Sequence, residues 1–327
     1  MSARALSVRQ ESWPIRGAFT ISRGTKTSAE VVVVEIAEDG ALGRGECVPY
    51  PRYGESPESA VRQIAEVRGE IEGGLSRTGL QGRLAAGAAR NAIDAALWDL
   101  EAKTTGTPAW RLAGVPEPGP LITAYTLSLD TPERMAAAAA AAQRPLLKLK
   151  LGGHGDVERV HAVRESAPGS RLIVDANEAW TPEVFARSAP ALAALGVELI
   201  EQPLAAGQDD ALSGLDRAVP VCADESCRGD GELESLDGRY EFVNLKLDKT
   251  GGLTAALELA HQAQARGFGI MLGCMLGTSL GMAPAALLGA AAAYVDLDGP
   301  LLLDADRSPG IRYEGSVMHP ARPALWG

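Results

Sequence analysis

The sequence predicts an α/β protein in which a short α+β region precedes a parallel barrel of strands and helices. The chain has 327 residues, and at about 150 residues per domain this length favours two domains over one. Predicted strands and then predicted helices occupy the first hundred residues, which is an α+β pattern. After residue 120, apolar strands alternate with helical stretches, as in parallel βα units.

The first region begins with a predicted β-hairpin. Two apolar runs flank the pair Asp39-Gly40, which is a common hairpin turn. Two helical patterns follow, and Ser56-Pro57 is suited to cap and begin the first of them. The expected strands and helices lie at 29–37, 41–48, 56–72 and 83–104. Residues 116–120 are rich in proline and are interpreted as a linker.

The second region contains eight predicted strands with seven helices between them. The strands lie at 121–126, 146–150, 171–175, 197–201, 219–224, 241–246, 268–273 and 293–298. The clearest helical stretches lie at 132–142, 156–165, 182–195 and 253–266. This number of strands favours a closed barrel, although an open doubly wound sheet shows the same alternation.

Composition disfavours several classes of protein. Lys and Arg number 31 against 42 Asp and Glu, a net charge of -11, whereas domains that bind nucleic acid or anionic lipid are usually basic. The four cysteines contain no Cys-x-x-Cys pair, so neither a disulfide framework nor a zinc knuckle is expected. The N-terminus shows no apolar signal segment, and a cytoplasmic location is therefore expected.

One stretch, 267–295, carries no charge and is long enough to span a membrane. Six glycines, one proline and the polar pair Thr278-Ser279 interrupt it. We interpret it as the seventh strand, a glycine-rich loop, an apolar helix and the start of the eighth strand. No membrane segment is therefore expected.

Charged residues end six of the predicted barrel strands, although buried parallel strands are usually apolar throughout. They are Lys150, Asp175, Glu201, Asp224, Lys246 and the pair Asp296/Asp298. The first five follow one another at spacings of 25, 26, 23 and 22 residues, about one βα unit each. Because reactive groups of a parallel barrel collect at the carboxyl ends of its strands, these side chains are expected around one mouth.

The three carboxylates in this set predict a metal site. A single aspartate at a strand end is more often a solvated loop residue, but Asp175, Glu201 and Asp224 recur in phase with consecutive strands. Three converging carboxylates repel one another without a cation. Ligands made only of oxygen suit a hard ion, and Mg²⁺ is the expected one.

The lysines predict acid–base chemistry. Lys148 and Lys150 are two residues apart on a strand and therefore point to the same face. Lys246 comes from the sixth strand, far around the barrel, so the two lysine groups address opposite faces of a central substrate. A neighbouring cation and a second ammonium lower a lysine's pKa, which allows it to act as a base. The four histidines lie away from the strand ends.

Five motifs together resemble the muconate-lactonizing subgroup of the enolase superfamily. They are Lys148-x-Lys150, Asp175-Ala-Asn177, Glu201-Gln-Pro203, Asp224-Glu225-Ser226 and Asn244-Leu-Lys246. The resemblance covers essentially the whole chain. It implies a modified TIM barrel, (β/α)7β, over residues 116–302 and an α+β N-terminal capping domain over 1–115, completed by about 303–327.

Within that subgroup, Asp296-Leu-Asp298 resembles the Asp-x-Asp pair of dipeptide epimerases, which holds the free α-ammonium of the substrate. The segments 19–27, 50–56, 243–254 and 272–279 resemble the epimerases that act on L-Ala-D/L-Glu. The resemblance therefore implies Mg²⁺-dependent epimerisation of this dipeptide in murein peptide recycling. The expected partner is a small dipeptide, with no nucleic acid and no membrane, and self-association is left open.

The resemblance also implies roles for individual residues. Mg²⁺ on Asp175, Glu201 and Asp224 would bind the terminal carboxylate and stabilise an enediolate, a chemistry known for enolase-superfamily sites. Lys150 and Lys246 would exchange the roles of base and acid. Arg23 in the capping loop would pair with the substrate's side-chain carboxylate, with Lys26 and Arg52 as alternatives. The remaining expected substrate contacts are Thr126, Lys148, Cys274, Met275, Asp296 and Asp298.

Other functions remain open at this point. The chain could epimerise other dipeptides, or it could be a cycloisomerase or an o-succinylbenzoate synthase of the same subgroup. Gly277-x-Ser279-x-Gly281 fits the nucleophile elbow of a serine hydrolase, with Asp298 and His319 following in triad order. A catalytically silent relative is a further alternative, although the intact lysines and carboxylates disfavour it.

Overall fold

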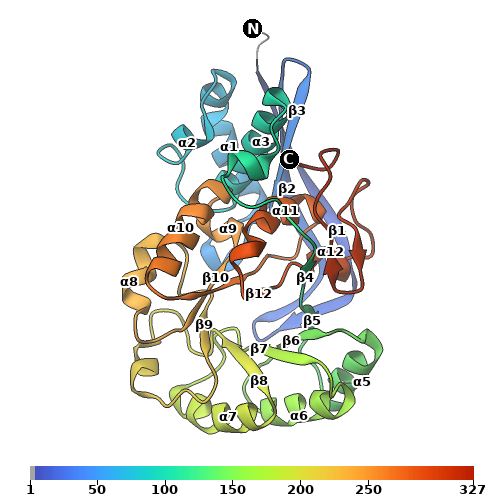
Figure 1. Cartoon of the computed structure of the whole chain (residues 1–327), viewed down its shortest axis with the longest axis vertical. Helices are drawn as coiled ribbons and strands as arrows, with labels where there is room; N and C mark the ends of the chain where they lie inside the picture. Colours follow the sequence, from blue (N-terminus) through green and yellow to red (C-terminus); the bar gives the residue numbers. More distant parts are fainter. Residues whose placement is uncertain (1–3) are drawn as a thin grey trace.

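The structure is a computed structural model that describes residues 4–327. Figure 1 shows the N-terminal sheet and its helices in the upper part of the molecule and the strands and helices of the barrel below them. The last residues of the chain return to the upper part, where the C-terminus lies near α3.

Three antiparallel strands form the N-terminal sheet: β1 (Ala5–Ile21), β2 (Gly24–Glu38) and β3 (Ala41–Cys47). The hairpin expected from the sequence is confirmed as β2 and β3. The pattern does not predict β1, because most of its residues are partly or fully exposed and its apolar residues form no continuous run. The helices of this domain are α1 (Pro57–Glu72), α2 (Arg77–Leu80), α3 (Ala88–Thr105) and α4 (Ala109–Leu112).

The valine run of β2 lies between two hydrophobic cores. Successive side chains of a strand point to opposite faces. Val32 and Val34 pack in the core built with α1 and α3, whereas Val31 and Val33 belong to the main core around the barrel. The sheet is therefore buried on both faces at this position, which explains why four valines occur in succession.

Eight parallel strands form the barrel, and their spatial order follows the chain. They are β5 (Tyr125–Leu127), β6 (Leu146–Lys150), β7 (Arg171–Asp175), β8 (Val197–Glu201), β9 (Val221–Ala223), β10 (Phe242–Leu245), β11 (Gly269–Leu272) and β12 (Tyr294–Val295). A bridge between Thr123 and Val295, with the N–H of Ala124 donating to the Val295 carbonyl at 2.7 Å, joins the first strand to the last. The closed barrel is therefore confirmed over the open sheet.

The barrel interior explains why charged residues end these strands. Its apolar layer consists of Ala124, Leu146, Ile173, Leu199, Cys222 and Met271, with Phe242 and Tyr294 packed against it. Alternate residues of a strand point inward, so the next inward position lies two residues later, nearer the carboxyl end. Lys148, Asp175, Glu201, Asp224 and Asp296 occupy those positions and line the mouth above the apolar layer.

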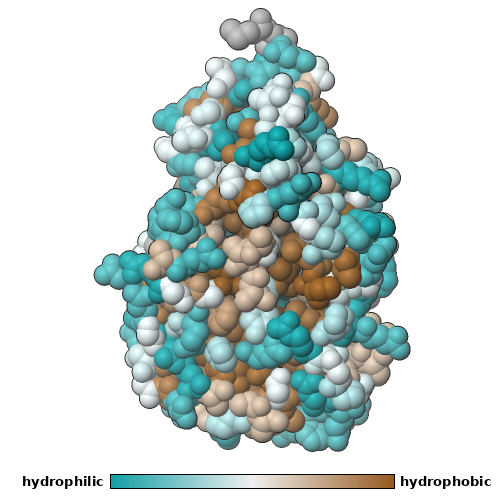
Figure 2. Space-filling view, viewed as in Figure 1, coloured by the Kyte–Doolittle hydropathy of each residue, from teal (hydrophilic) through white to brown (hydrophobic). Residues whose placement is uncertain are grey.

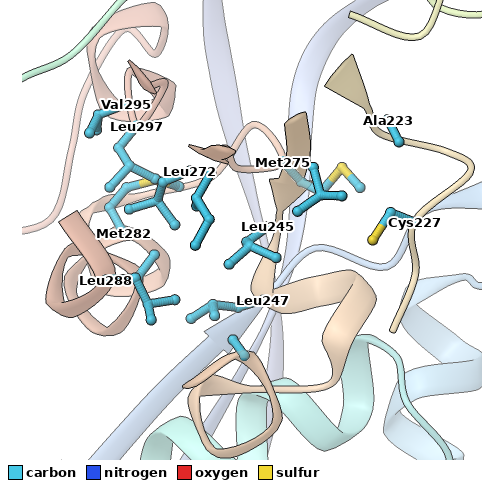
Figure 3. Packing of buried hydrophobic residues seen from close by; sticks show 14 of the residues in the cluster. Ala223, Cys227, Leu245, Leu247, Leu272, Met275, Met282, Leu288, Val295 and Leu297 are labelled. Carbon is cyan, nitrogen blue, oxygen red and sulfur yellow. The ribbon is translucent and has the colours of Figure 1, made fainter. Parts of the chain in front are cut away.

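Helices on the outside connect most of the strands. The full connecting helices are α5 (Pro132–Ala142), α6 (Asp156–Ser166), α7 (Pro182–Ala194), α10 (Leu253–Ala265) and α11 (Ser279–Ala285), the last continued by η4 (Ala286–Ala291). The prediction of seven helices is wrong at two connections, which contain only η2 (Asp210–Gly214) and the short η3 (Asp230–Glu232) and α8 (Leu233–Leu236). Figure 3 shows Leu245 of β10, Leu272 of β11 and Leu288 of η4 in one part of the hydrophobic core.

The same threonine–proline signal begins two of these helices. Thr131 and Thr181 each accept a hydrogen bond at the side chain from a backbone N–H three residues later, and a proline follows each threonine. Such caps satisfy amides that have no partner within the helix, and proline fits the first helical turn.

The uncharged stretch at 267–295 forms β11, a loop, α11, η4 and β12, as expected. No helix in the described part of the chain is long and apolar enough to cross a bilayer. Hydrophobic colour in Figure 2 is concentrated in the middle of the visible face. Leu42 and Ile122 are the large apolar side chains that lie exposed among residues 4–327.

The C-terminal segment packs against the N-terminal domain. The indole N–H of Trp326 donates to the Ala95 carbonyl at 2.9 Å, and the backbone N–H of Gly327 donates to Asp99 at 2.8 Å. Before it lies a small sheet of β4 (Leu121–Ile122), β13 (Tyr313–Glu314) and β14 (Val317–Met318). The domain boundaries at 115 and 302 stay a prediction.

Candidate active site

The charged strand ends face a pocket of about 830 Å³ between the barrel mouth and the capping loops. Barrel residues that line it include Thr126, Lys148, Lys150, Asn177, Asp224, Lys246, Cys274, Met275, Asp296 and Asp298. The capping side contributes Phe19, Arg23, Lys26, Tyr50, Arg52 and Tyr53. A cavity of this size accommodates a small-molecule ligand, and both domains are needed to enclose it.

Lys148 lies at the centre of the carboxylates. Its Nζ is 2.6 Å from Glu201 Oε2, 2.8 Å from Asp296 Oδ2 and 3.3 Å from Asp175 Oδ2. The neighbouring Lys150 lies on the same side of β6, with its Nζ 2.6 Å from Asp175 Oδ2. Lys148 and Lys150 therefore point to the same face of β6, as expected from their spacing.

Lys246 lies across the mouth, directly after β10. Its Nζ is 2.6 Å from Asp224 Oδ2 and 3.9 Å from Glu201 Oε1. The amide of Asn244 also donates to Glu201 Oε1, at 2.7 Å. Because β6 and β10 are four strands apart in a closed barrel of eight, Lys150 and Lys246 approach the pocket from opposite sides.

The donor set of Asp175, Glu201 and Asp224 fits a hard divalent cation. All three carboxylates are buried on consecutive strands, where ionised groups need compensating charge. Glu201 Oε2 lies near Lys148 but accepts no well-directed hydrogen bond, which leaves a buried oxygen available to a cation. Lysine ammonium groups lie between these carboxylates. Within residues 4–327, no three Asp, Glu, His or Cys side chains are therefore close enough to one another to form a complete metal site in this structure. A bound cation would replace some of these ammonium contacts.

Burial and the protein's own charges shift the pKa values of these groups in different directions. Burial and the nearby Asp175 raise the pKa of Glu201 to about 7. Burial opposes ionisation of Asp175 as well, but Lys150 and Lys148 hold its pKa below the ordinary value. Burial alone would lower the pKa of Lys246, yet Asp224 and Glu201 raise it above the ordinary value. For Lys246, the expected lowering of the pKa is therefore not produced by the protein's own charges. A cation bound to the same carboxylates would oppose this rise.

Asp296 and Asp298 form an anionic corner next to the lysines. The backbone N–H of Thr126 donates to Asp298 Oδ2 at 2.6 Å, and its hydroxyl donates to Asp296 Oδ1 at 3.4 Å. Burial, with Asp296 beside it, raises the pKa of Asp298 to about 7. Cys274 and Met275 line the pocket nearby, and burial raises the pKa of the Cys274 thiol, so this sulfur is not an activated nucleophile.

Arg23 is paired with the barrel. It lies in the turn between β1 and β2, and its guanidinium is 2.7 Å from Glu225 Oε1 and 3.1 Å from Glu178 Oε2. Arg52, in η1 (Pro51–Tyr53), makes a two-point pair with the same Glu178. Lys26 makes no ion pair in the described part of the chain; its Nζ lies 4.8 Å from the centre of the Tyr50 ring. The three candidate cations therefore differ in what already neutralises them.

Several residues of the site were not singled out by the sequence reasoning. Lys249 is buried behind Asp224, and Glu178 anchors the capping loops. Glu225, which the sequence reasoning named only as part of a motif, also holds Arg23. Asn177 and Glu178 have φ of 45° and 67°, the left-handed region that non-glycine residues rarely adopt. The spacing of Lys249, three residues after Lys246, could have identified it as a second lysine on one helical turn.

The serine hydrolase alternative is wrong. The Ser279 side chain is fully buried, its hydroxyl donates to Asp306, and it accepts the N–H of Ile311 at 2.9 Å. His319 pairs instead with Glu314, at 3.2 Å. A nucleophile elbow needs an exposed serine beside a histidine, and neither condition is met.

The family assignment rests on both parts of the chain. Residues 131–320 match the family described as enolase C-terminal domain-like. Residues 3–114 match the N-terminal domain of mandelate racemase and muconate lactonizing enzyme. The chain belongs to the enolase superfamily. The strand-end lysines and carboxylates of this enolase-superfamily protein are thus placed on the fold that the resemblance implies.

Two curated relatives align over nearly their whole length. The L-Ala-D/L-Glu epimerase of Escherichia coli K12 is 48% identical over 97% of this chain and 99% of its own. The N-acetyl-D-glutamate racemase of a Pseudoalteromonas species is 46% identical over 91% and 95%. Sequence identity alone therefore leaves two types of substrate to be distinguished at the site.

Two solved structures share the fold closely. An enolase family member from Agrobacterium tumefaciens with homology to dipeptide epimerases, bound to sodium and L-Ala-L-Glu, superposes with a TM-score of 0.97 at 51% identity over 99% of this chain and 100% of its own. A dipeptide epimerase from Enterococcus faecalis, complexed with Mg and L-Leu-L-Tyr, gives a TM-score of 0.91 at 31% identity over 98% of both chains.

Proposed function

We propose that this protein is a Mg²⁺-dependent epimerase of L-Ala-D/L-Glu dipeptides that uses Lys150 and Lys246 as its two acid–base groups. One observation carries the proposal. The two lysines enter the pocket from strands on opposite sides of the barrel, each against a carboxylate of one buried triad. A pair of opposed lysines can remove a proton from one face of a carbon and return it to the other.

The triad would hold the cation, and the lysines would carry the proton. Asp175, Glu201 and Asp224 are the residues that would bind Mg²⁺, which supplies positive charge for the carboxylate of the substrate as its α-proton leaves. Lys150 and Lys246 would exchange roles with the configuration of the substrate. Lys148, buried between the triad and Asp296, would supply a further positive charge at the same end. Burial excludes water from these groups and strengthens their interactions.

The anionic corner supports a substrate with a free ammonium group. Asp296 and Asp298 are both buried and lie close enough for Asp296 to raise the pKa of Asp298. An α-ammonium between them would compensate the buried negative charge. Substrates of cycloisomerases and o-succinylbenzoate synthases lack that group, and an N-acetylated glutamate lacks it as well. This corner therefore favours a dipeptide over those alternatives.

For the side-chain carboxylate of the substrate we assign Lys26 rather than Arg23. Arg23 and Arg52 already face Glu178 and Glu225, so a substrate carboxylate would have to compete with them. Lys26 lines the same pocket and contacts the face of Tyr50. Among these three cations, Lys26 is therefore the one that would give up no existing ion pair to bind a substrate carboxylate.

Exchange in deuterated water tests the reaction directly. With Mg²⁺, L-Ala-L-Glu should gain one mass unit at the glutamate α-carbon and convert to L-Ala-D-Glu, and a chelator should stop both. Lys150→Ala and Lys246→Ala should each abolish epimerisation, and each should retain exchange of only one epimer, the opposite one in the two variants. Arg62→Ala, at an exposed position of α1 and outside the pocket lining, is the control and should behave as wild type.

A panel of substrates separates the alternatives. Wild-type protein is offered L-Ala-L-Glu, apolar and cationic dipeptides, and N-acetylglutamate. Preference for another dipeptide would keep the chemistry and reject the Ala-Glu assignment. Faster turnover of N-acetylglutamate would reject the ammonium role of Asp296 and Asp298. Absence of exchange with every substrate, despite metal binding, would indicate a catalytically silent protein.

The cellular setting is part of the proposal. We infer a cytoplasmic enzyme that acts in the recycling of murein peptides, a role that suits the proposed substrate. We also propose that the capping domain comprises 1–115 with 303–327, supported by the contacts of Trp326 and Gly327 with α3. Cell fractionation and limited proteolysis at 113–120 test these two inferences.

A further inference from the structure

A fourth lysine, Lys249, lies behind the candidate metal site. It belongs to the single-turn helix α9 (Leu247–Thr250), and its side chain is fully buried. Its Nζ donates to Asp224 Oδ1 at 2.7 Å, to the Asp224 backbone carbonyl at 2.5 Å and to the Asn244 carbonyl at 3.0 Å. All three protons of the ammonium group therefore have a fixed acceptor.

Lys249 differs from the other three lysines of the site. Lys148, Lys150 and Lys246 line the pocket, whereas Lys249 is absent from its lining. The pocket lysines can exchange a carboxylate partner for a substrate or yield it to a cation. Lys249 has no open side from which a ligand could approach, so any influence it has on the reaction passes through its partners, Asp224 and the backbone of Asn244.

The local fold explains how two lysines reach one aspartate. Lys246 precedes the first residue of α9 and Lys249 follows three residues later, so both side chains lie on the same side of the turn. Lys246 contacts Oδ2 of Asp224 and Lys249 contacts Oδ1. The two oxygens of this carboxylate therefore have separate partners, one facing the pocket and one facing the protein interior.

We propose that Lys249 is a positioning residue that holds Asp224 by Oδ1, so that Oδ2 alone is presented to the cation at the barrel mouth. The inference rests on the proposed function, because it concerns a ligand of the proposed metal site. Partners behind metal ligands commonly contribute 10- to 100-fold to metal affinity. Lys249 is also a permanent counter-charge for Asp224, since no metal or substrate can displace it.

Binding of Mn²⁺, followed by the electron paramagnetic resonance signal of the free ion, tests this without turnover. Lys249→Met keeps the length of the side chain and removes its charge and hydrogen bonds. We expect its dissociation constant for Mn²⁺ to rise about 10- to 100-fold over wild type. An affinity within twofold of wild type, or a tighter one, would overturn the proposal.

The matched control is Thr250→Val. Thr250 is buried on the same helical turn, but its hydroxyl donates within the turn, to the carbonyls of Leu247 and Gly252. This variant should bind Mn²⁺ as wild type does, and a loss equal to that of Lys249→Met would assign the effect to disruption of α9. If wild type itself binds no Mn²⁺, the proposed metal site fails, which is a different outcome from failure of Lys249.

A second comparison covers the case in which Lys249→Met folds but is strongly destabilised. Removing one partner of a buried ion pair leaves an uncompensated charge, whereas removing both does not. The fall in melting temperature caused by Lys249→Met should therefore be much smaller in an Asp224→Asn background than in wild type. Equal falls in the two backgrounds would show that Lys249 does not act on Asp224, and would overturn the proposal.

Discussion

At the scale of one residue, the first prediction concerns Lys26, the pocket cation that has no carboxylate partner in the described part of the chain. Lys26→Met should lower kcat/KM for L-Ala-L-Glu roughly 10-fold, since a hydrogen bond to a charged group contributes about 1.5–3 kcal/mol. The same variant should change kcat/KM for L-Ala-L-Leu little. Steady-state kinetics with both dipeptides measures the ratio.

Arg23→Met is the informative comparison for this experiment. Arg23 ties the β1–β2 turn to Glu178 and Glu225, so its removal should lower kcat/KM for both dipeptides together. If Arg23→Met lowers kcat/KM only for L-Ala-L-Glu and Lys26→Met does not lower it, the contact with the side-chain carboxylate of the substrate belongs to Arg23.

The residues found from sequence are those that interrupt an apolar strand. Asp175, Glu201 and Asp224 stand out because a charge at the end of a buried strand is unusual and recurs about once per βα unit. Lys249 and Glu178 lie in the segments that follow those strands, where charged residues are common. Their importance depends on distances of about 3 Å across the fold, which no spacing along the chain reveals.

Glu178 gives the prediction at the scale of elements, because it fastens two capping loops to the barrel. Its carboxylate accepts Arg23 from the β1–β2 turn and both guanidinium donors of Arg52 from η1, and it also accepts the N–H of Ala206 at 2.9 Å. Glu178→Gln removes the negative charge that holds both loops. Backbone amide exchange should become faster at 20–28 and 50–55, and KM for the dipeptide should rise several-fold.

Hydrogen–deuterium exchange by mass spectrometry on the substrate-free protein measures the loops, and steady-state kinetics measures KM. Glu183→Gln, an exposed glutamate in the first turn of α7, removes the same charge a short distance along the chain and should change neither. If exchange in both loops is as slow in Glu178→Gln as in wild type, the loops are held by other contacts.

Elements with strong local signals were predicted well, and those without them were not. The barrel strands are continuous apolar runs, and α5 and α7 carry threonine–proline caps. By contrast, β1 exposes most of its side chains and gains its order from pairing along the length of β2. The short η2 and α8 replace two expected helices, because alternation along the chain does not specify how long each connection is.

At the scale of the whole molecule, the capping domain is docked on the segment that follows β10, the strand before Lys246. Arg90 of α3 donates to the carbonyls of Thr250 and Gly251, and Trp98 donates to the Thr254 hydroxyl at 3.0 Å. Elsewhere in the interface, Glu46 of β3 accepts the backbone N–H of Thr278 from the barrel at 2.8 Å. These contacts fix the position of α9, and with it Lys246, through buried polar groups of the other domain.

Asp248 is the carboxylate in this interface whose charge is least compensated. It is half-buried, and its Oδ1 accepts the N–H of Val48 at 3.0 Å and the amide of Asn91 at 2.8 Å. Burial raises its pKa from the ordinary 3.8 to about 7, and Glu55 and Glu46 add to the effect. The folded protein therefore keeps a proton between pH 3.8 and 7 that the unfolded chain releases.

The sign of the pH dependence follows from that difference in bound protons. Where the folded state holds more protons, the free energy of unfolding falls as pH rises. The contribution of Asp248 is thus least unfavourable near pH 4 and most unfavourable above pH 7, by a few kcal/mol at most (~1.4 kcal/mol per pKa unit). Asp248→Asn keeps the acceptor oxygen for Val48 and Asn91 and cannot ionise.

We therefore expect Asp248→Asn to be more stable than wild type at pH 8 and to lose that advantage near pH 4.5, where wild-type Asp248 is already protonated in the folded protein. Urea unfolding of both proteins at the two pH values measures the difference in free energy, and the titration of all other groups cancels in the comparison. A stability difference independent of pH would mean that Asp248 is ionised in the interface at both values, and that the two domains meet around a charge which their buried contacts compensate.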